Sequence, residues 1–192
     1  MKEEMYVMRC AWADTDPLLQ KYHDEEWGRP VHDDRKHYMY LPMEAMSCGL
    51  SWLLMLKKLE VFRVCFADFD YNKVPNFTDD DACRIAAEEG MIHSERKVKA
   101  MITNARAFCK VREEFGTFDK YIWSFTNGQT MIYPEHQKEP CVRNELSDRV
   151  AKDMKRRGFK YVGSVIVYSH LQGIGVINDH QHNCFLYNPN LK

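Results

Sequence analysis

The chain has 192 residues, seven cysteines and a formal net charge of −1 at pH 7, so it is long enough for one domain, or two small lobes, with a real core. It has no apolar run of the roughly 18 residues that a membrane span needs and no signal-peptide core, so we expect no membrane association. The odd, scattered cysteines favour reduced thiols in the cytoplasm over a disulfide framework. The balanced charge argues against a protein that coats nucleic acid without specificity.

The first third of the chain predicts two helices. We expect MYLPMEAMSCG, residues 39–49, to be helical, with Pro42 in a first turn or at a kink because proline has no amide hydrogen to donate. The stretch SWLLMLKKLEVFRVCF, begun by Ser51, predicts one further helix. Lys57 and Lys58 lie on the surface of that amphipathic helix, which argues against a catalytic lysine.

A helix pair follows. Thr78 is the expected N-cap of FTDDDACRIAAEEG, with Asp81 completing a capping box and Gly90 as the stop. Ser94 is the expected cap of SERKVKAMITNARAFCKVREEFG. Its apolar residues recur with the period of a helix, so one face of this segment is predicted to be buried.

The last third of the chain mixes helices with one loop. TFDKYIWSF predicts a helix, and residues 127–144 predict a loop because they contain turn residues and little periodicity. SDRVAKDMKRRG predicts a helix from Ser147 to the stop at Gly158. The Val- and Ile-rich segment 161–176 would suit a buried strand, but the sequence has no evident partner strands, so we predict a helix there.

Two stretches could bind phosphate. The short connection GMIH, Gly90 to His93, could direct backbone amides and a helix N-terminus at a phosphate, with Lys97 in the first turn of the next helix. KDMKRRGFK, Lys152 to Lys160, holds five basic residues. A plain helix connection and a solvated helix face account for the same patterns, so both interpretations stay open.

The tail NDHQHNC gathers metal-ligating side chains. His180 and Cys184 are four residues apart, so on a helical turn they would face the same way. Imidazole and thiolate together suit zinc, which prefers four such ligands in a structural site. The other two must come from elsewhere, and Cys10 and His23 are candidates near the opposite end of the chain. His182 is an alternative ligand.

Six motifs occur in order along most of the chain: RCAW, DPLLQKYHDEEWGRPVHDD, GLSWLLMLKKLEVFRVCFADFD, KVKAMITNARAF, YIWSF and KRRGFKYVGSVIVYSHLQGIGVINDH. From about residue 9 to 184 the chain thereby resembles the DNA-3-methyladenine glycosylase I family of bacterial base-excision repair. The resemblance implies an all-α, helix-hairpin-helix glycosylase-like fold. Residues 1–192 would form a single domain, with two small lobes around a base pocket.

The resemblance also implies two sites. One is a structural zinc, one per chain, that clips the two chain ends together through Cys10, His23, His180 and Cys184. The other is a base pocket, for which the matching positions are Trp12, Tyr22, Trp27, Glu44 and Trp52.

These residue types suit the implied reaction, hydrolysis of the N-glycosidic bond of N3-methyladenine in alkylated double-stranded DNA. The methylated base is a cation, so aromatic faces and the carboxylate of Glu44 would favour it over adenine. Departure of the neutral base relieves the charge, so water can be the nucleophile without a Schiff base or an assisting aspartate. We expect a monomer that binds DNA through Lys97 and Arg156, with Leu50 as the wedge.

This chain also departs from the family pattern, and other functions fit parts of it. EAMSCGLSW places Ala45 to Cys48 where the family usually has a glycine and a Gln-Ala pair, and the predicted hairpin has His93 and Glu95 where basic residues are common. The first departure raises the alternative of a binder of alkylation damage with weak or no turnover. A metallohydrolase would need an open zinc position, and a helical interaction protein would need no aromatic pocket.

Overall fold

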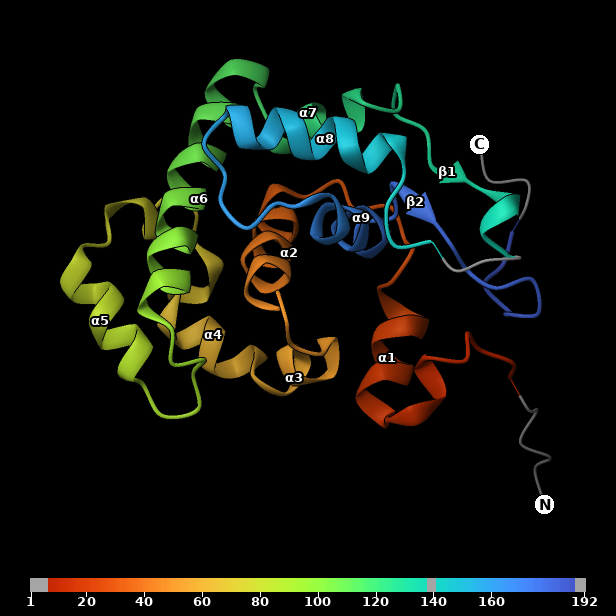
Figure 1. Cartoon of the computed structure of the whole chain (residues 1–192), viewed down its shortest axis with the longest axis horizontal. Coiled ribbons are helices and arrows are strands. Elements are labelled where there is room, and N and C mark those ends of the chain that lie inside the picture. The colour runs from red at the N-terminus through yellow and green to blue at the C-terminus, as the bar shows by residue number, and fades with distance from the viewer. Residues whose placement is uncertain (1–6, 138–140, 189–192) are drawn as a thin grey trace.

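Helices α2 and α9 lie in the middle of the molecule, and other helices pack around them (Figure 1). The computed structural model describes residues 7–137 and 141–188. The helices are α1 (Pro17–Glu25), α2 (Asp34–Met46), α3 (Trp52–Lys57), α4 (Leu59–Cys65), α5 (Asp79–Ala87), α6 (Glu95–Phe115), α7 (Phe118–Ser124), α8 (Glu145–Arg156) and α9 (Ser164–Gly173). Short 3-10 helices occur at η1 (Ala13–Thr15), η2 (Ala67–Phe69), η3 (Val74–Asn76) and η4 (Pro134–Gln137), and two strands at β1 (Met131–Ile132) and β2 (Ile177–Asn178).

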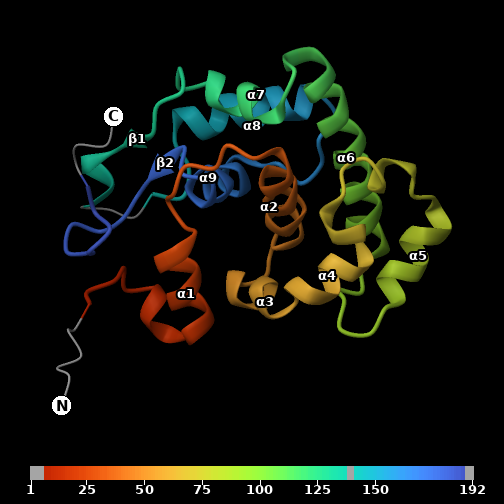
Figure 2. The same cartoon turned by 180° about the vertical axis from the view of Figure 1, so that it is seen from behind.

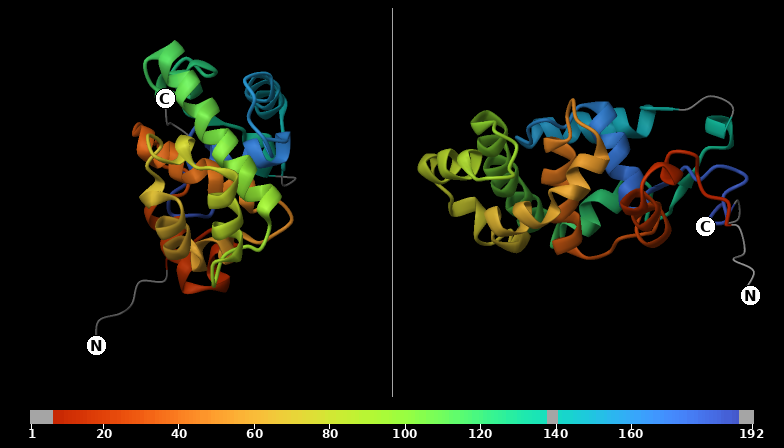
Figure 3. Two further views of the ribbon diagram at one scale, coloured as in Figure 1. Left: turned by 90° about the vertical axis from the view of Figure 1, so that its left-hand side faces the viewer. Right: turned by 90° about the horizontal axis from the view of Figure 1, so that it is seen from below.

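The packing builds one hydrophobic core around the central helices. Helix α2 packs against α6, α7 and α9, and α8 covers α9. Seen from behind, α7 and α8 cover one side of this core, while α1 and α3 lie on the other (Figure 2). Tyr38, Phe108 and Leu171 are among the fully buried side chains that these helices contribute. The molecule is longer in one direction, with α5 at one end and the first and last described residues, 7 and 188, toward the other (Figure 3).

Several helix starts follow the local signals that predict them. The Thr78 side chain accepts from the Asp81 amide while the Asp81 carboxylate accepts from the Thr78 amide, which confirms the capping box. The Ser51 hydroxyl accepts from the Leu54 amide and begins α3. Ser94 precedes α6 as predicted, although its side chain makes no capping hydrogen bond. Helix α5 ends at Ala87, a few residues before the predicted stop.

Three predictions about the helices need correction. The helix expected from Ser51 to the end of its apolar pattern is divided into α3 and α4 at Lys58, where the backbone leaves the helical conformation. Of the two places expected for Pro42, the first turn is wrong: Pro42 lies inside α2, so the Tyr38 carbonyl has no amide partner one turn later. Helix α8 begins earlier than Ser147, because Asn144 and Ser147 form a reciprocal capping box.

The segment 161–176 is helical over α9, as predicted, and the main prediction of a helical fold is confirmed. The exception is a pair of two-residue strands: β1 pairs in parallel with β2, so the expected loop 127–144 contains a strand and η4. This pairing carries the tail away from α9. No helix in the described part of the chain is both long and apolar enough to cross a membrane.

The turn after α9 depends on Gly175, which has a φ of +73°. A Cβ there would lie 2.3 Å from the backbone carbonyl carbon of Arg29. The neighbouring Val31 amide donates to the Ile174 carbonyl at 3.0 Å. The α1–α2 connection and the α9 turn are therefore in direct backbone contact.

We predict that Gly175→Ala lowers the free energy of unfolding by about 2–4 kcal/mol, because the new methyl group adds both backbone strain and a steric clash. Gly163→Ala is the matched control, since a Cβ there meets nothing within 4 Å. It should cost about 1 kcal/mol or less. Chemical denaturation of both variants measures the difference, and equal stabilities would contradict the prediction.

Candidate functional site

The predicted metal ligands come together. Cys10 precedes η1, His23 lies in α1, and His180 and Cys184 lie in the tail after β2. All four side chains are buried, and their ligand atoms lie within 4.8 Å of one another. Cys184 Sγ is 3.4 Å from His23 Nε2 and 3.5 Å from His180 Nδ1, and Cys10 Sγ is 3.6 Å from His180 Nδ1. This cluster, which we call the terminal clip, could bind a metal ion.

Burial gives the terminal clip the electrostatics of a cation site. It raises the pKa of the Cys10 thiol to about 12 and lowers the pKa of His180 to about 4, so burial favours the neutral imidazole. The Gln181 amide donates to Cys10 Sγ at 3.3 Å and the Leu186 amide to Cys184 Sγ at 3.4 Å. Amide donors stabilise thiolates. A bound cation would stabilise them further and so offset the effect of burial, which favours the neutral thiols.

A second layer of contacts holds the clip in place. His23 Nδ1 lies 2.8 Å from Asp24 Oδ1, and Arg9 donates to the same carboxylate at 2.8–2.9 Å. Such a carboxylate fixes the imidazole's orientation and leaves Nε2 toward the metal. His182, the alternative ligand, is outside the clip, and its ring contacts Tyr187 at a centroid distance of 4.5 Å.

A continuous row of aromatic rings leads from the clip to a pocket. The His180 ring packs edge-on against Trp27 at 4.7 Å, and Trp27 against Trp12 at 5.1 Å. Trp12 lies 6.3 Å from Tyr22, and Tyr22 lies 5.3 Å from Trp52. The position of each ring therefore depends on the neighbour that is nearer the clip.

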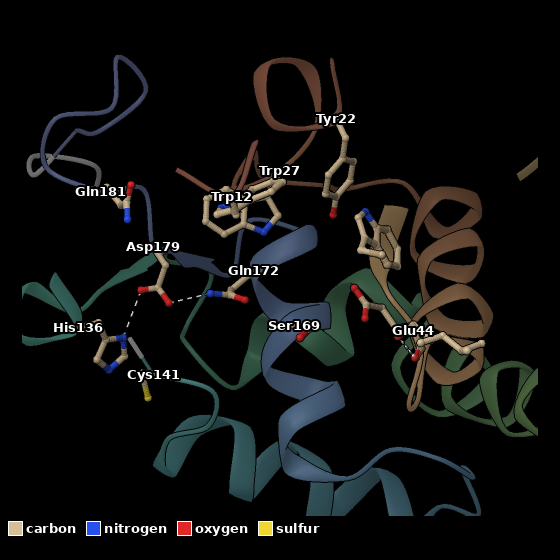
Figure 4. A pocket seen from close by; sticks show the side chains of 13 residues that line it. Trp12, Tyr22, Trp27, Glu44, His136, Cys141, Ser169, Gln172, Asp179 and Gln181 are labelled. Carbon is tan, nitrogen blue, oxygen red and sulfur yellow. Dashed lines mark hydrogen bonds and ion pairs between the residues drawn. The ribbon is translucent and has the colours of Figure 1, made fainter. Parts of the chain in front are cut away.

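The pocket has a volume of about 450 Å³ and lies between the head of the chain, the α2–α3 turn and α9. All five predicted pocket residues line it: Trp12, Tyr22, Trp27, Glu44 and Trp52. Figure 4 shows the labelled aromatic side chains along one side, with Glu44 at the opposite end from Asp179 and His136. Leu50, the predicted wedge, lines the pocket and is 40% exposed.

Glu44 provides the buried carboxyl group of this pocket. Its side chain is 4% exposed, and burial raises the pKa of its carboxyl to about 8. Burial also raises the pKa of the Tyr22 and Tyr40 phenols, and their proximity to Glu44 adds to that shift. Burial thus favours the protonated form of Glu44 at neutral pH, and a cation in the pocket would favour the carboxylate.

The pocket also contains polar residues that sequence reasoning missed. Ser169 and Gln172 come from α9, where they are three residues apart and so share a face. The Asp179 carboxylate accepts from the Gln172 side-chain amide at 2.8 Å and from the Tyr168 hydroxyl. It also lies 3.2 Å from His136 Nδ1. The helical spacing of this polar pair was a usable signal, whereas the contact with His136 spans 43 residues.

The altered stretch after Glu44 affects the pocket less than expected. Among the described residues, Ser47 is the member of that stretch that lines the pocket. Ala45 and Met46 are fully buried in the core, and Cys48 is exposed. The helical twist at the end of α2 turns successive side chains to different faces, so one residue of the four reaches the pocket.

The structure separates the predicted DNA contacts. Lys97, in the first turn of α6, directs its ammonium at backbone carbonyls behind the pocket wall. Arg156 is highly exposed at the end of α8, where it pairs with Asp153. Of the three predicted residues, Leu50 is the one beside the pocket.

A family model described as methyladenine glycosylase matches residues 12–187. The chain belongs to the methyladenine glycosylase family. It is 38% identical to DNA-3-methyladenine glycosylase 1 of Escherichia coli K12, over 95% of this chain and 98% of that protein. It is 33% identical to the Haemophilus influenzae DNA-3-methyladenine glycosylase, over 92% of this chain and 96% of that protein.

Solved structures agree with this assignment. A crystal structure of a 3-methyladenine DNA glycosylase I has a TM-score of 0.88 and 39% identity, covering 94% of this chain and all of that one. The Staphylococcus aureus structure that addresses 3-methyladenine recognition has a TM-score of 0.87 and 33% identity, covering 92% and 94%. The methyladenine glycosylase family thus shares this fold over nearly the whole chain, and its enzymes hydrolyse N-glycosidic bonds.

The raised pKa of Glu44 predicts a cost in stability. Its folded-state pKa of about 8 exceeds the usual value of 4.5, so stability falls as pH rises from about 4.5 to 8. We expect Glu44→Gln to stabilise the protein by up to about 3–5 kcal/mol at pH 8 and by little at pH 4. Glu89→Gln, at an exposed position, is the control. Denaturation of each variant at pH 4 and pH 8 measures the effect. The same stability difference between Glu44→Gln and the wild type at both pH values would contradict the prediction.

Proposed function

We propose that the chain is a monofunctional DNA glycosylase that hydrolyses the N-glycosidic bond of N3-methyladenine in alkylated double-stranded DNA and leaves an abasic site. The observation that carries this proposal is the aromatic pocket with a buried carboxylate at its end. A solved relative, 32% identical, is in complex with 3-methyladenine, which supports the same ligand here. The whole chain would act as one catalytic domain and as a monomer.

Selectivity follows from charge. N3-methyladenine in DNA is a cation, so the faces of Tyr22, Trp52 and the neighbouring rings attract it by roughly 0.5–2 kcal/mol per contact more than neutral adenine. Glu44 ionises as the cation enters and can accept hydrogen bonds from the edge of the base. Neutral adenine does not stabilise the carboxylate of Glu44, so adenine gains less from entering the pocket and remains stacked in the duplex.

The chemistry needs little acid catalysis. The bond between the sugar and the cationic base breaks with its electron pair passing to the base, which leaves neutral. The sugar becomes oxocarbenium-like, and water adds to it and loses a proton. Among the described residues that line the pocket there is no lysine, which supports water over an amine as the nucleophile. When the extruded base binds to Glu44 and the aromatic faces, its N-glycosidic bond is oriented for this step.

The terminal clip fits one structural zinc ion. A tetrahedral zinc would hold sulfur and nitrogen ligands about 3.5 Å apart, and the sulfur-to-nitrogen distances in the clip are 3.4–3.6 Å. Four protein ligands leave no open coordination position, so this metal would support folding rather than activate water. None of the seven cysteines, all within the described residues, forms a disulfide, which supports a reducing, cytoplasmic setting.

DNA docking would use the basic end of α8 and the rim of the pocket. Arg156 and the stretch that continues to Lys160 would contact phosphates, and Leu50 would wedge into the duplex beside the extruded base. The exposure of Leu50 at the pocket supports this role. Apolar wedges of this kind unstack base steps at a cost that the new contacts offset.

Protein purified without added zinc should contain about one equivalent of zinc, because four preformed ligands bind it tightly. Cys184→Ser removes one ligand, so we expect lost metal and a lower melting temperature. Cys83→Ser, at an exposed cysteine outside the clip, should keep both. Elemental analysis and thermal denaturation provide the measurements, and full zinc occupancy in Cys184→Ser would refute the ligand assignment.

Wild-type protein should release radiolabelled 3-methyladenine from methylated DNA and ignore uracil. Glu44→Gln removes the charge but keeps the shape, so kcat/KM should fall about 10- to 100-fold, the value of a hydrogen bond to a charged group. Trp52→Ala removes a stacking face worth roughly 1–3 kcal/mol. A well-folded, zinc-loaded wild type that binds damaged DNA without releasing base would instead be a damage binder.

A further inference from the structure

We propose that Lys97 is a positioning residue for base excision, which holds the pocket wall in place from behind. This inference rests on the proposed function. Lys97 Nζ donates to the Met46 carbonyl at 2.9 Å and to the Cys48 carbonyl at 2.8 Å. Those carbonyls belong to the end of α2 and the turn after it, which we call the wall turn (residues 46–51). The wall turn links Glu44 to Trp52.

Beyond Met46, which is buried in the core, few contacts other than those of Lys97 hold the wall turn. Within it, the Ser47 hydroxyl donates to the Glu44 carbonyl at 2.7 Å and the Leu50 amide donates to the Ser47 carbonyl at 2.6 Å. Gly49 has a φ of +81°, and a Cβ there would meet nothing within 4 Å, so the turn is not packed against another element at this point. Residues 48–51 are exposed. The two hydrogen bonds from Lys97 therefore contribute a large share of what fixes its geometry.

A lysine is suited to this position. The last carbonyls of a helix have no amide partner and carry partial negative charge, so an ammonium both satisfies and neutralises them. Lys97 comes from another helix and bridges one carbonyl inside α2 and one beyond it. It thereby fixes the angle at which the chain leaves α2, and with it the placement of Ser47 and Leu50 at the pocket.

A second lysine joins the hairpin between α5 and α6 to the α3–α4 junction. Lys58, at the α3–α4 junction, donates to the Gly90 carbonyl. His93 Nδ1 lies 2.8 Å from the Ala86 carbonyl at the end of α5. The polar side chains of this hairpin thus serve internal contacts, and two of the three N–H donors of Lys97 are already used. A brace for the pocket explains these contacts better than a phosphate clamp.

The experiment compares Lys97→Met, which removes the donors, with Lys97→Arg, which can still bridge two carbonyls. Lys110→Met on the same helix is the control for loss of one positive charge, since Lys110 is exposed. Arg156→Met serves as the reference for a lost phosphate contact. Three readouts are needed: hydrogen exchange of the wall turn without DNA, kcat/KM for 3-methyladenine release, and the salt dependence of DNA binding.

We expect Lys97→Met to speed exchange at the Ser47 and Leu50 amides about tenfold or more, because charge-assisted hydrogen bonds are lost. The kcat/KM should fall by a similar factor, with Lys97→Arg recovering most of both. The salt slope should stay as in Lys110→Met, whereas Arg156→Met should lower it by roughly one unit. Should Lys97→Met not fold, Lys97→Gln, which keeps one donor group, takes its place.

Two results would overturn the proposal. If Lys97→Met lowers the salt slope by about one unit and leaves exchange of the wall turn unchanged, Lys97 is a phosphate contact. If exchange and kcat/KM both match the wild type, Lys97 positions nothing. Failure of the wild type to release base would refute the proposed function instead, and the exchange measurement would still decide whether Lys97 braces the wall turn.

Discussion

The convergence of Cys10, His23, His180 and Cys184 is the constraint on which the pocket depends. Helix α1 and the segment before it lie at the edge of the molecule, where α1 packs against η1 and α3. These segments and the residues just after α1 nonetheless supply three aromatic pocket residues: Trp12, Tyr22 and Trp27. By joining the head of the chain to the tail that follows α9, the terminal clip fixes those rings against the helical core.

The pocket exchanges stability for charge recognition. Burial of Glu44 without a cationic partner raises the pKa of its carboxyl and destabilises its ionised form in the empty protein. The same burial makes the carboxylate a strong partner for a cation, because little water screens the interaction. A more polar pocket would be more stable when empty and less selective between a methylated base and its neutral counterpart.

The parts of the site that were predictable are residues within ordered sequence motifs. The parts that were not predictable depend on contacts between segments far apart in the sequence. The five pocket residues and four ligands followed from motifs that resemble one family, and the structure brings each set together. Asp179 and its partner His136 were missed because the short β1–β2 pairing, which joins their segments, leaves no periodic signal in two-residue strands.

The sequence by itself determined the helical class of the fold and several helix starts, because caps such as that of Thr78 depend on residues three positions away. Only the tertiary structure decided how side chains with many neighbours are used. Lys97 looked like a phosphate ligand in the first turn of a helix, yet its ammonium binds carbonyls that lie 49 and 51 residues earlier in the chain. A long flexible side chain finds its partner only after packing has brought that partner within reach, and no local pattern records the distance.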